Sequence, residues 1–253
     1  MAFRDATELI ETISTKVPRH LYYSSARYAY PAAKDMEEKG WLGSDMLFDV
    51  DADHICQNIR KISFCPSCGE VGDSTCPIHG QTTEFFEIDE QCLRKASENT
   101  WKLVEVLRED LGLEGKVYFS GNRGFHVHVE CRGNCGRLGP DERREVVSYI
   151  VGKGIMVDQQ VTVDIRRLTR IPGSLHGKSG LIVFNLTSPE HFSYGPHLSP
   201  FSGVSVFVPF VSVNLKVLET NLNLRRNSAM KVETGLAVHM SLKGLGKVMA
   251  HVK

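Results

Sequence analysis

The chain has 253 residues, of which 42% are hydrophobic and 24% are charged. This is the composition of a globular protein, and the chain is long enough to bury a full hydrophobic core. Thirty basic and thirty acidic residues cancel to a formal net charge of zero, which excludes a chain that is basic overall. A locally basic groove is compatible with this balance, so a nucleic-acid enzyme is not excluded.

The sequence predicts an intracellular protein that does not enter a membrane. No apolar run approaches the roughly 20 residues that a membrane helix needs. The first residues, MAFRDATELIE, contain acidic side chains and no long apolar segment. Signal and transit peptides are poor in acidic residues, so the sequence predicts neither. Seven cysteines are an odd number, and three of them lie in a tight cluster typical of metal ligands. These features favour a reducing compartment over a disulfide framework.

Hydrophobic periodicity and capping residues predict helices and strands along the whole chain. The expected elements are a helix over 5–17, a strand over 45–51, a Cys- and Gly-rich loop over about 64–82, a helix over 90–111, a hairpin over 116–130, a helix that starts at Pro140, and strands over 181–186 and 204–210. Gly112 fits the C-terminal cap of the longest helix. This order predicts an α+β domain with a mixed, mostly antiparallel sheet.

The stretch MLFDVDADH places three aspartates at the end of an apolar strand. Alternate residues of a strand share a face, which separates Met46, Phe48 and Val50 from Leu47, Asp49 and Asp51. Like charges this close are unfavourable unless a cation lies between them, and paired carboxylates suit Mg²⁺ or Mn²⁺. The alternative is that the aspartates only begin a solvated loop, and for Asp53 we favour that structural role.

The stretch YFSGNRGFHVHVE combines a glycine-rich turn with polar side chains on one strand face. Ser120 offers a hydroxyl, Arg123 offers a fork that matches phosphate, and the glycines let the backbone approach a ligand closely. His126 follows on the strand, on the same face as His128. Together these groups predict a phosphate-binding turn. The alternative is a hairpin turn with a polar outer face, and we expect His128 to be a neighbour and not a ligand.

A second basic segment, RRLTRIPGSLHGKSGL, contains Arg170, His176 and Lys178 around flexible glycines. Its chemistry suits phosphate, although it lacks the Gly-x4-Gly-Lys-Ser/Thr spacing of a Walker motif. The alternative is a solvated basic face. Asp158 and Asp164 lie just before it, and each is a candidate for a third carboxylate.

The cysteine cluster predicts a zinc site. Its Cys-x2-Cys and Cys-x2-His pairs supply four ligands, Cys65, Cys68, Cys76 and His79. Four nitrogen and sulfur ligands complete a tetrahedral shell, which is typical of structural and not of catalytic zinc. Cys56 or Cys92 is the alternative fourth ligand, and Cys131 and Cys135 are expected to be ordinary thiols.

Taken in this order, the segments resemble the catalytic small subunit of archaeal and eukaryotic DNA primases, within the archaeo-eukaryotic primase superfamily. The resemblance spans residues 18–186 and rests on the stretches PRHLYYSSARYAYP, KGWLGSDMLFDVDADH, the zinc loop, FSGNRGFHVHV and RLTRIPGSLHGKSGL. It implies a primase catalytic core with an RRM-like half and a mixed or antiparallel sheet. The whole chain, 1–253, would form a single catalytic domain with an inserted zinc knuckle over about 64–82.

The resemblance also implies roles for individual residues. Asp49 and Asp51 match the family's Mg²⁺- or Mn²⁺-binding pair. The third carboxylate lies eighteen residues before the loop histidine in the family, which favours Asp158 over Asp164. The residues that match the nucleoside triphosphate site are Ser120, Gly121, Arg123, His126, Arg170, His176 and Lys178. Asn122 departs from the pattern, because many relatives carry a second arginine at that position.

The activity implied is DNA-dependent priming, in which two divalent ions support template-directed nucleotidyl transfer from nucleoside triphosphates on single-stranded DNA. The implied partners are the template, the nucleotides and a primase large subunit, in the cytoplasm and near the nucleoid if the source is archaeal. Three alternatives remain. They are a primase-polymerase or repair polymerase of the same superfamily, a two-metal nuclease, and a non-catalytic zinc subunit that binds nucleic acid.

Overall fold

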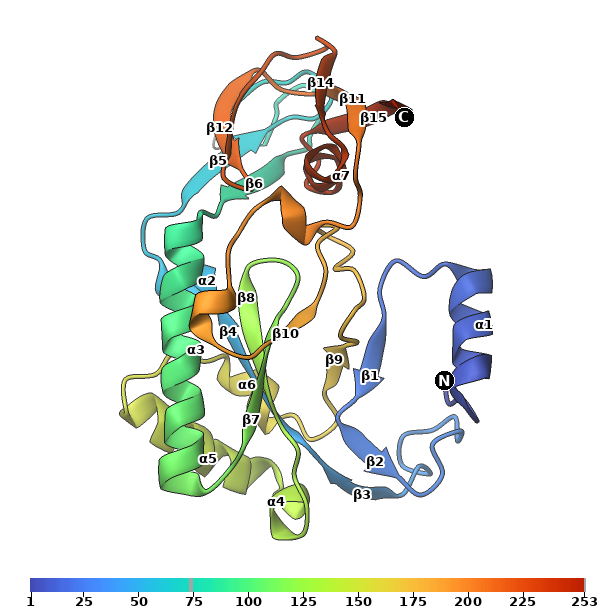
Figure 1. The fold of residues 1–253 in the computed structure, drawn as a ribbon, viewed down its shortest axis with the longest axis vertical. Coiled ribbons are helices and arrows are strands. Elements are labelled where there is room, and N and C mark those ends of the chain that lie inside the picture. Colours follow the sequence, from blue (N-terminus) through green and yellow to red (C-terminus); the bar gives the residue numbers. More distant parts are fainter. Residues whose placement is uncertain (73–74, 253) are drawn as a thin grey trace.

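In the computed structural model, which describes residues 1–72 and 75–252, a four-stranded antiparallel sheet lies at the centre (Figure 1). Its strands lie in the order β10 (Phe184–Leu186), β7 (Gly115–Phe119), β8 (Gly124–Val129) and β4 (Met46–Asp51). Met46, Phe48 and Val50 are buried on one face, as their alternation predicts. The predicted aspartate strand and hairpin are therefore neighbours in this sheet.

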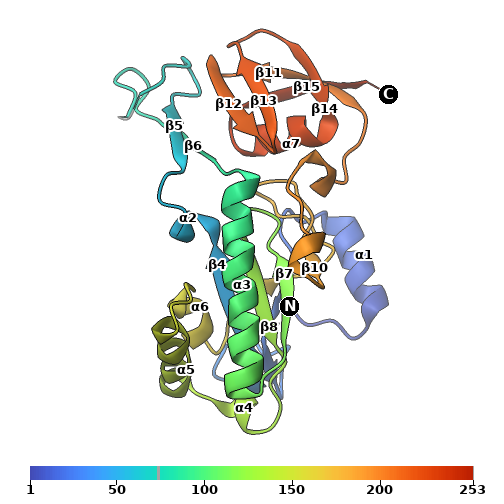
Figure 2. The same ribbon diagram turned by 60° about the vertical axis from the view of Figure 1, so that its left-hand side comes forward.

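Helix α3 (Glu90–Leu111) covers the apolar face of the sheet (Figure 2). Its bounds agree with the sequence prediction. Asp89 caps the N-terminus by accepting a hydrogen bond from the backbone N–H of Cys92 at 2.8 Å, and Gly112 ends the helix in the left-handed conformation. The leucines at 93, 103 and 107 are fully buried against the strands. Helix α3 thus buries one face of the sheet and leaves the polar side chains on the opposite face.

Three shorter helices border β4. They are α2 (Ala52–Ile55), α5 (Pro140–Gly152) and α6 (Gln159–Val163). α5 begins at the predicted proline, and α6 packs against both α5 and β4. The hydroxyl of Thr162 donates to the carbonyl oxygen of Leu47 at 2.8 Å. As a result Leu47, which we expected on an open polar face with the aspartates, is only 5% exposed.

Arg143 of α5 is a buried cation that binds backbone carbonyls. It is 1% exposed, and its guanidinium donates to the carbonyl oxygens of Ser44 (2.9 Å), Asp45 (3.1 Å), Leu138 (3.1 Å) and Thr162 (3.4 Å). A further hydrogen bond of 2.8 Å reaches the hydroxyl of Ser44. These contacts join α5 and α6 to the strand that leads into β4.

Arg143→Met is expected to lower the free energy of unfolding by roughly 3 kcal/mol or more, because several carbonyl oxygens around the guanidinium lose an N–H donor that methionine cannot replace. Arg144→Met is the matched control. Arg144 is exposed and pairs with Asp141 on the surface, so its loss should change stability by less than about 1 kcal/mol. Urea unfolding of both variants measures the difference, and equal stabilities would contradict a structural role for Arg143.

Three two-stranded ribbons surround the central sheet. They pair β1 (Tyr22–Ser24) with β9 (Leu168–Arg170), β2 (Ala26–Tyr28) with β3 (Trp41–Ser44), and β5 (Arg60–Phe64) with β6 (Thr83–Glu87). The β1–β9 ribbon lies over the polar face of the sheet. There the hydroxyl of Tyr23 lies 3.0 Å from His128 Nδ1, and the hydroxyl of Thr169 lies 3.1 Å from Nε2. Both ring nitrogens of His128 thus lie next to hydroxyl groups of this ribbon, and its role as a neighbour of the site stays a prediction.

The last part of the chain forms a C-terminal unit (residues 203–252). It contains β11 (Val204–Pro209), β12 (Val213–Val217), β13 (Thr220–Leu224), β14 (Met230–Glu233), α7 (Thr234–Leu242) and β15 (Gly246–Val252). The short helices α4 (Asn134–Arg137), η1 (Pro189–His191) and η2 (Pro196–Leu198) lie in connecting segments. One continuous cluster of buried apolar side chains runs from the central sheet into this unit.

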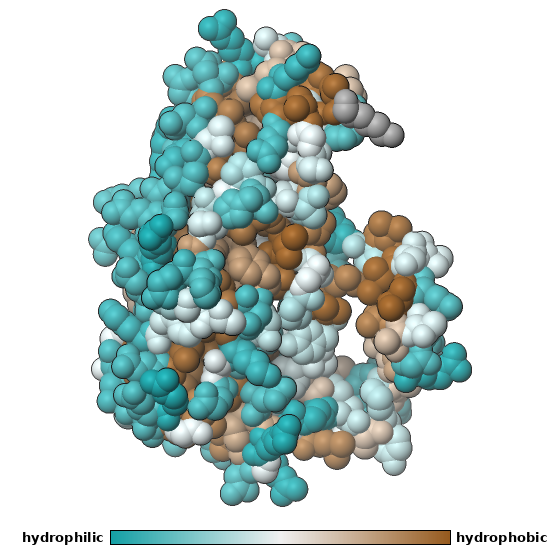
Figure 3. Space-filling view, in the orientation of Figure 1, coloured by the Kyte–Doolittle hydropathy of each residue, from teal (hydrophilic) through white to brown (hydrophobic). Residues whose placement is uncertain are grey.

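Helix α1 (Ala6–Lys16) lies apart from this core, near its predicted position. None of its residues is buried, and Ile10 (62%) and the adjacent Val17 (80%) are strongly exposed. Figure 3 shows an apolar area on the right, where Figure 1 places this helix. In the described part of the chain, no helix has both the length and the apolar character needed to cross a membrane.

Two disulfides correct the expectations for the cysteines. Cys56 pairs with Cys92, and Cys131 pairs with Cys135. The first bond joins the end of α2 to the first turn of α3, where the two Cα atoms lie 5.9 Å apart, so neither cysteine is an alternative zinc ligand. The second pair are not the ordinary thiols that we expected. The sequence favoured a reducing compartment over a disulfide framework, and it did not reveal the Cys56–Cys92 pair because spatial proximity across 36 residues is not visible in it.

Candidate active site

Three of the predicted carboxylates gather at one end of β4. Asp49 and Asp51 lie on the polar face of the sheet, where Asp49 is paired with His126 of β8 and Asp51 with Gly124. The backbone N–H of Asp158 donates to the carbonyl oxygen of Asp49 at 2.9 Å. Asp49, Asp51 and Asp158 line one cavity of about 300 Å³.

Asp164 lies at the opposite end of α6 from Asp158. There it ends the helix, and its carboxylate accepts a hydrogen bond from the backbone N–H of Arg166 at 2.9 Å. Asp158 is the N-cap of the same helix. The structure therefore brings Asp158, and not Asp164, to the wall that Asp49 and Asp51 share.

The electrostatics of this cavity favour a bound cation. Burial and, next, the charge of the neighbouring Asp158 raise the pKa of Asp49 to about 6. Burial and then the charge of Asp49 raise the pKa of Asp51, also to about 6. The Oδ1 atom of Asp49 is buried and accepts no hydrogen bond from the described residues. Carboxylate oxygens are the ligands that Mg²⁺ and Mn²⁺ prefer, and a cation would relieve the repulsion between these carboxylates, so the chemistry of the donor set suits such an ion.

These pKa shifts predict that the affinity for Mn²⁺ falls as the pH is lowered through about 6, because protonated carboxyls are not ligands. Two carboxyls titrate, so the expected loss is roughly tenfold to a hundredfold per pH unit below 6. In the metal-free protein the folded state holds extra protons between the ordinary pKa of 3.8 and about 6. Its stability should therefore fall as the pH rises through that window.

Melting temperatures measured from pH 4.5 to 7.5, with and without Mn²⁺, check both statements. The metal should raise the melting temperature near pH 7 and lose this effect near pH 5. A stabilisation by Mn²⁺ that is independent of pH would contradict the assignment of these carboxyls.

The predicted phosphate-binding turn packs tightly against the second basic segment. Gly121 has φ +80°, and a Cβ atom there would lie 2.8 Å from the Cβ of His176, so only glycine fits. Ser120 is buried beside it, and the hydroxyl of Ser179 donates to the carbonyl oxygen of Gly121. Two segments more than 50 residues apart in sequence thus meet at one place, as expected if they bind the same ligand.

Arg123 and His126 connect this turn to the carboxylates. The guanidinium of Arg123 lies 3.0 Å from an oxygen of Asp53 and 3.8 Å from one of Asp51. His126 Nε2 lies 3.5 Å from Asp49 Oδ1. Burial and, next, the charge of Arg170 lower the pKa of His126 to about 4. Asp53 lies in α2 and is the ion-pair partner of Arg123, so it does not begin the solvated loop that we favoured for it.

The second basic segment surrounds a separate cavity of about 190 Å³, which also has Asp49 in its wall. Its lining includes His126, Arg167 and Arg170. Arg170 lies 4.8 Å above the ring of Tyr22, and its guanidinium contacts His20 Nδ1 at 3.2 Å. His176 and Lys178 lie on the adjoining loop, where His176 Nδ1 accepts a hydrogen bond from the backbone N–H of Lys178 at 3.1 Å.

Several residues of the site were missed by sequence reasoning. They are His20, Tyr22, His54, Arg167, His239 and Lys243. Arg167 stands inside a basic run from which spacing alone could not select it. His20, Tyr22 and His54 lie in stretches that carry the resemblance, but nothing in those stretches assigned them a role. His239 and Lys243 lie in segments without a motif and reach the site only through the fold.

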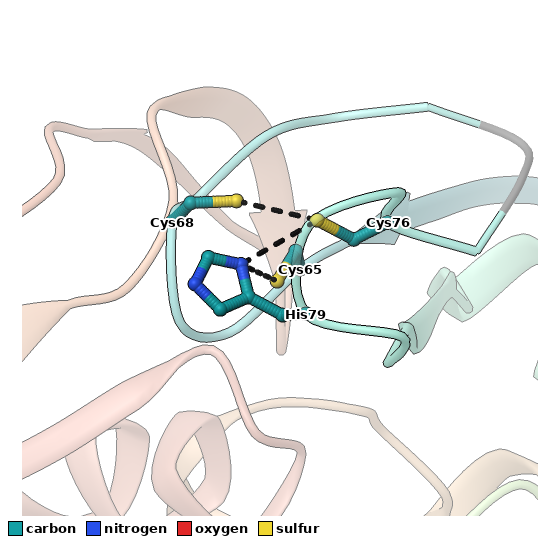
Figure 4. A group of neighbouring side chains, drawn as sticks. All are labelled: Cys65, Cys68, Cys76 and His79. Carbon is teal, nitrogen blue, oxygen red and sulfur yellow. Dashed lines mark hydrogen bonds between the residues drawn. The ribbon is translucent and has the colours of Figure 1, made fainter.

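The four predicted zinc ligands converge in the loop between β5 and β6 (Figure 4). One ligand atom from each of Cys65, Cys68, Cys76 and His79 lies within 4.8 Å of all the others. The Sγ atoms of Cys68 and Cys76 are 3.7 Å apart, and His79 Nδ1 lies 3.6 Å from Cys65 Sγ. Tetrahedral zinc with Zn–S bonds of about 2.3 Å separates its sulfur ligands by about 3.8 Å. The cluster thus fits a closed, structural zinc site. Residues 73 and 74 of the predicted loop lie outside the described residues.

Comparison with known proteins agrees with this geometry. Residues 86–154 match the model of the DNA primase small subunit family, and residues 203–252 match the model of a primase C-terminal domain. The "DNA primase small subunit PriS" of Saccharolobus islandicus is 43% identical over a 280-residue alignment, which covers all of this chain and 84% of the relative. The chain belongs to the DNA primase small subunit family.

More distant members extend the comparison. The PriS of Sulfolobus acidocaldarius is 40% identical, with all of this chain and 84% of the relative covered. The PriS of Aeropyrum pernix is 32% identical, and the alignment covers 98% of this chain and 81% of the relative. Membership in this family makes the chain a nucleotidyltransferase of DNA replication.

Proposed function

We propose that this primase small subunit makes short primers on single-stranded DNA by adding nucleotides from nucleoside triphosphates. The carboxylates of Asp49, Asp51 and Asp158 would hold two Mg²⁺ or Mn²⁺ ions. Such ions lower the pKa of an attacking 3′-hydroxyl and stabilise the pyrophosphate leaving group when they are bound. The chain itself orients the two substrates.

The observation that carries this proposal is the position of Asp49 in the wall of two cavities. One cavity is acidic and contains Asp51 and Asp158, and the other is basic and contains His126 and Arg170. A triphosphate suits the basic side, while the acidic side leaves room for the hydroxyl that attacks it. Nucleotide transfer requires the two substrates to lie next to each other, and Asp49 lies where the two proposed substrate cavities adjoin.

The basic groups would orient the triphosphate and neutralise the charge that develops on it. At Gly121 the triphosphate could approach the backbone closely, and Ser120 offers its hydroxyl group. Arg123 is held near the carboxylates by Asp53 and Asp51. The remaining groups assigned to this role are His126, Arg170, His176 and Lys178. No side chain needs to act as a covalent nucleophile.

We further propose that residues 1–253 act as one catalytic domain with a primase-type, RRM-like core, into which the zinc knuckle over about 64–82 is inserted. Arg226 of the C-terminal unit donates to the carbonyl oxygen of Ser67 at 2.6 Å, which supports a structural role for zinc in joining the knuckle to the rest. A primase large subunit is the proposed partner, and the place of action is the replicating DNA.

De novo synthesis on an unprimed single-stranded DNA template tests the proposal. The assay uses labelled ATP or dATP with Mg²⁺ or Mn²⁺, with and without the large subunit. Short products would support priming. Extension of primed template alone, even with the large subunit, would favour a primase-polymerase or repair polymerase. Degradation of the template would favour a two-metal nuclease, and DNA binding without any reaction would favour a non-catalytic subunit.

A further inference from the structure

Lys243, just after α7 in the C-terminal unit, reaches the predicted phosphate-binding turn. Its Nζ atom donates to Asn122 Oδ1 at 2.6 Å, across a sequence separation of 121 residues. Both residues line a small cavity of about 80 Å³ together with Arg123 and His239. A side chain from outside every motif of the site is thus fixed next to the turn.

The surroundings of Lys243 are cationic. Burial, followed by the charges of Arg123 and Lys178, lowers the pKa of Lys243 to about 8. Lys243 in turn contributes to the lowered pKa of His176. Among the described residues, no carboxylate forms an ion pair with Lys243. The acid in the same cavity, Glu84, pairs with Lys61 at 2.5 Å.

A partly buried cation beside other cations raises the free energy of the unliganded protein. The hydrogen bond to Asn122 does not remove this cost, because the amide is neutral. An anion close to Lys243 would remove it, and would at the same time be close to Arg123, which lines the same cavity. The arrangement therefore favours a polyanionic ligand at the turn.

We propose that Lys243 is a further phosphate-binding side chain of the nucleotide site, and that Asn122 is the positioning residue that holds it there. This inference rests on the proposed function, in which Arg123, His176 and Lys178 bind the triphosphate. It adds the C-terminal unit to the parts of the chain that make the site.

Binding of ATP and of inorganic tripolyphosphate to the full chain, in the presence of Mg²⁺, tests the inference. Tripolyphosphate probes the phosphate contacts without any contribution from base or sugar. Lys243→Met should weaken the affinity for both ligands about tenfold or more, since hydrogen bonds to charged groups contribute about 1.5–3 kcal/mol. Lys243→Arg should retain most of the affinity. Lys247→Met is the matched control, because this lysine of β15 is exposed and should leave binding unchanged.

Asn122→Leu separates positioning from direct binding. Alone it should weaken tripolyphosphate binding less than Lys243→Met does. Combined with Lys243→Met it should add little, because Asn122 acts through the lysine. If Asn122 bound phosphate independently, the two losses would multiply, and its assignment as a positioning residue would be wrong.

A purely structural role for Lys243 predicts a different result. Lys243→Met would then lower the melting temperature and weaken the binding of single-stranded DNA and tripolyphosphate alike. We expect instead that the melting temperature of the ligand-free protein does not fall, because the substitution removes an unfavourable charge.

Arg123→Ala distinguishes failure of this inference from failure of the proposed function. If Arg123→Ala loses tripolyphosphate binding and Lys243→Met retains it, the inference is overturned and the triphosphate site stands. If both variants retain it, the proposed triphosphate site is itself wrong, and the inference falls with it.

Discussion

Replacing Asp49 by asparagine is expected to reduce nucleotide transfer by at least about a thousandfold while the chain remains folded. Asparagine keeps the size of the side chain and removes the charge that would hold a divalent ion between the two cavities. Loss of metal-ion stabilisation of the transition state amounts to several kcal/mol, and each step of about 1.36 kcal/mol is a factor of ten in rate. Primer synthesis or extension by equal amounts of native and variant protein measures the effect.

The same substitution should raise the melting temperature of the metal-free protein near pH 7. Burial and the charge of Asp158 both disfavour the ionised Asp49 carboxylate, and asparagine carries no charge. A variant that is more stable and inactive would separate catalysis from folding. An Asp49→Asn variant that is unfolded would contradict the prediction that removing the buried charge stabilises the protein.

Asp158→Asn and Asp164→Asn form a matched pair for the third carboxylate. They lie at the two ends of the same short helix, and only Asp158 lines the cavity with Asp49. We expect Asp158→Asn to lose activity to a similar extent as Asp49→Asn and Asp164→Asn to keep most of it. The reverse result would show that Asp164 is the ligand.

Removing the zinc is expected to unfold the knuckle around residues 64–82. The binding of a structural zinc ion contributes on the order of 10 kcal/mol to folding, and this free energy is lost when the ion is removed. Cys68→Ser removes one of the four ligands and should reduce the zinc content well below one per chain. Elemental analysis gives the stoichiometry, and hydrogen exchange reports the loss of protection in the loop.

Cys131→Ser is the control for this experiment. It also replaces a cysteine by serine, but at the disulfide next to α4, far along the chain from the knuckle. It should leave the zinc content at one per chain. A native protein that is folded and contains much less than one zinc would contradict the zinc assignment.

Helices, strands and ligand clusters that are determined by residues close together in the sequence could be predicted from it. Helix α3 was predicted with its observed bounds because its buried leucines recur at helical spacing and its cap, Gly112, lies at its end. The alternation in β4 placed Asp49 and Asp51 on one face for the same kind of reason. The proposed zinc ligands, which include Cys65 and His79, follow spacings that a tetrahedral ion would impose directly on the sequence.

Features that depend on contact between distant segments were not predictable. Leu47 obeys the alternation but is buried by α6, which lies more than 100 residues later. Cys56 and Cys92 become partners because α2 lies against α3. Lys243 carries no motif at all, and it reaches the turn through its hydrogen bond with Asn122. In each case the deciding quantity is a distance in space, and hydrophobic periodicity contains no information about it.

The packing of Gly121 against His176 and the hydrogen bond from Lys243 to Asn122 join segments that the ribosome makes at different times. The turn that Gly121 begins is synthesised long before the residues that enclose it. At about 5–20 residues per second, the 121 residues between Asn122 and Lys243 take roughly 6 to 24 s. During that interval the nascent chain already contains the acidic strand, while the turn at Asn122 still lacks its contact with Lys243. The proposed phosphate-binding site therefore stays incomplete on that side until Lys243 has been synthesised.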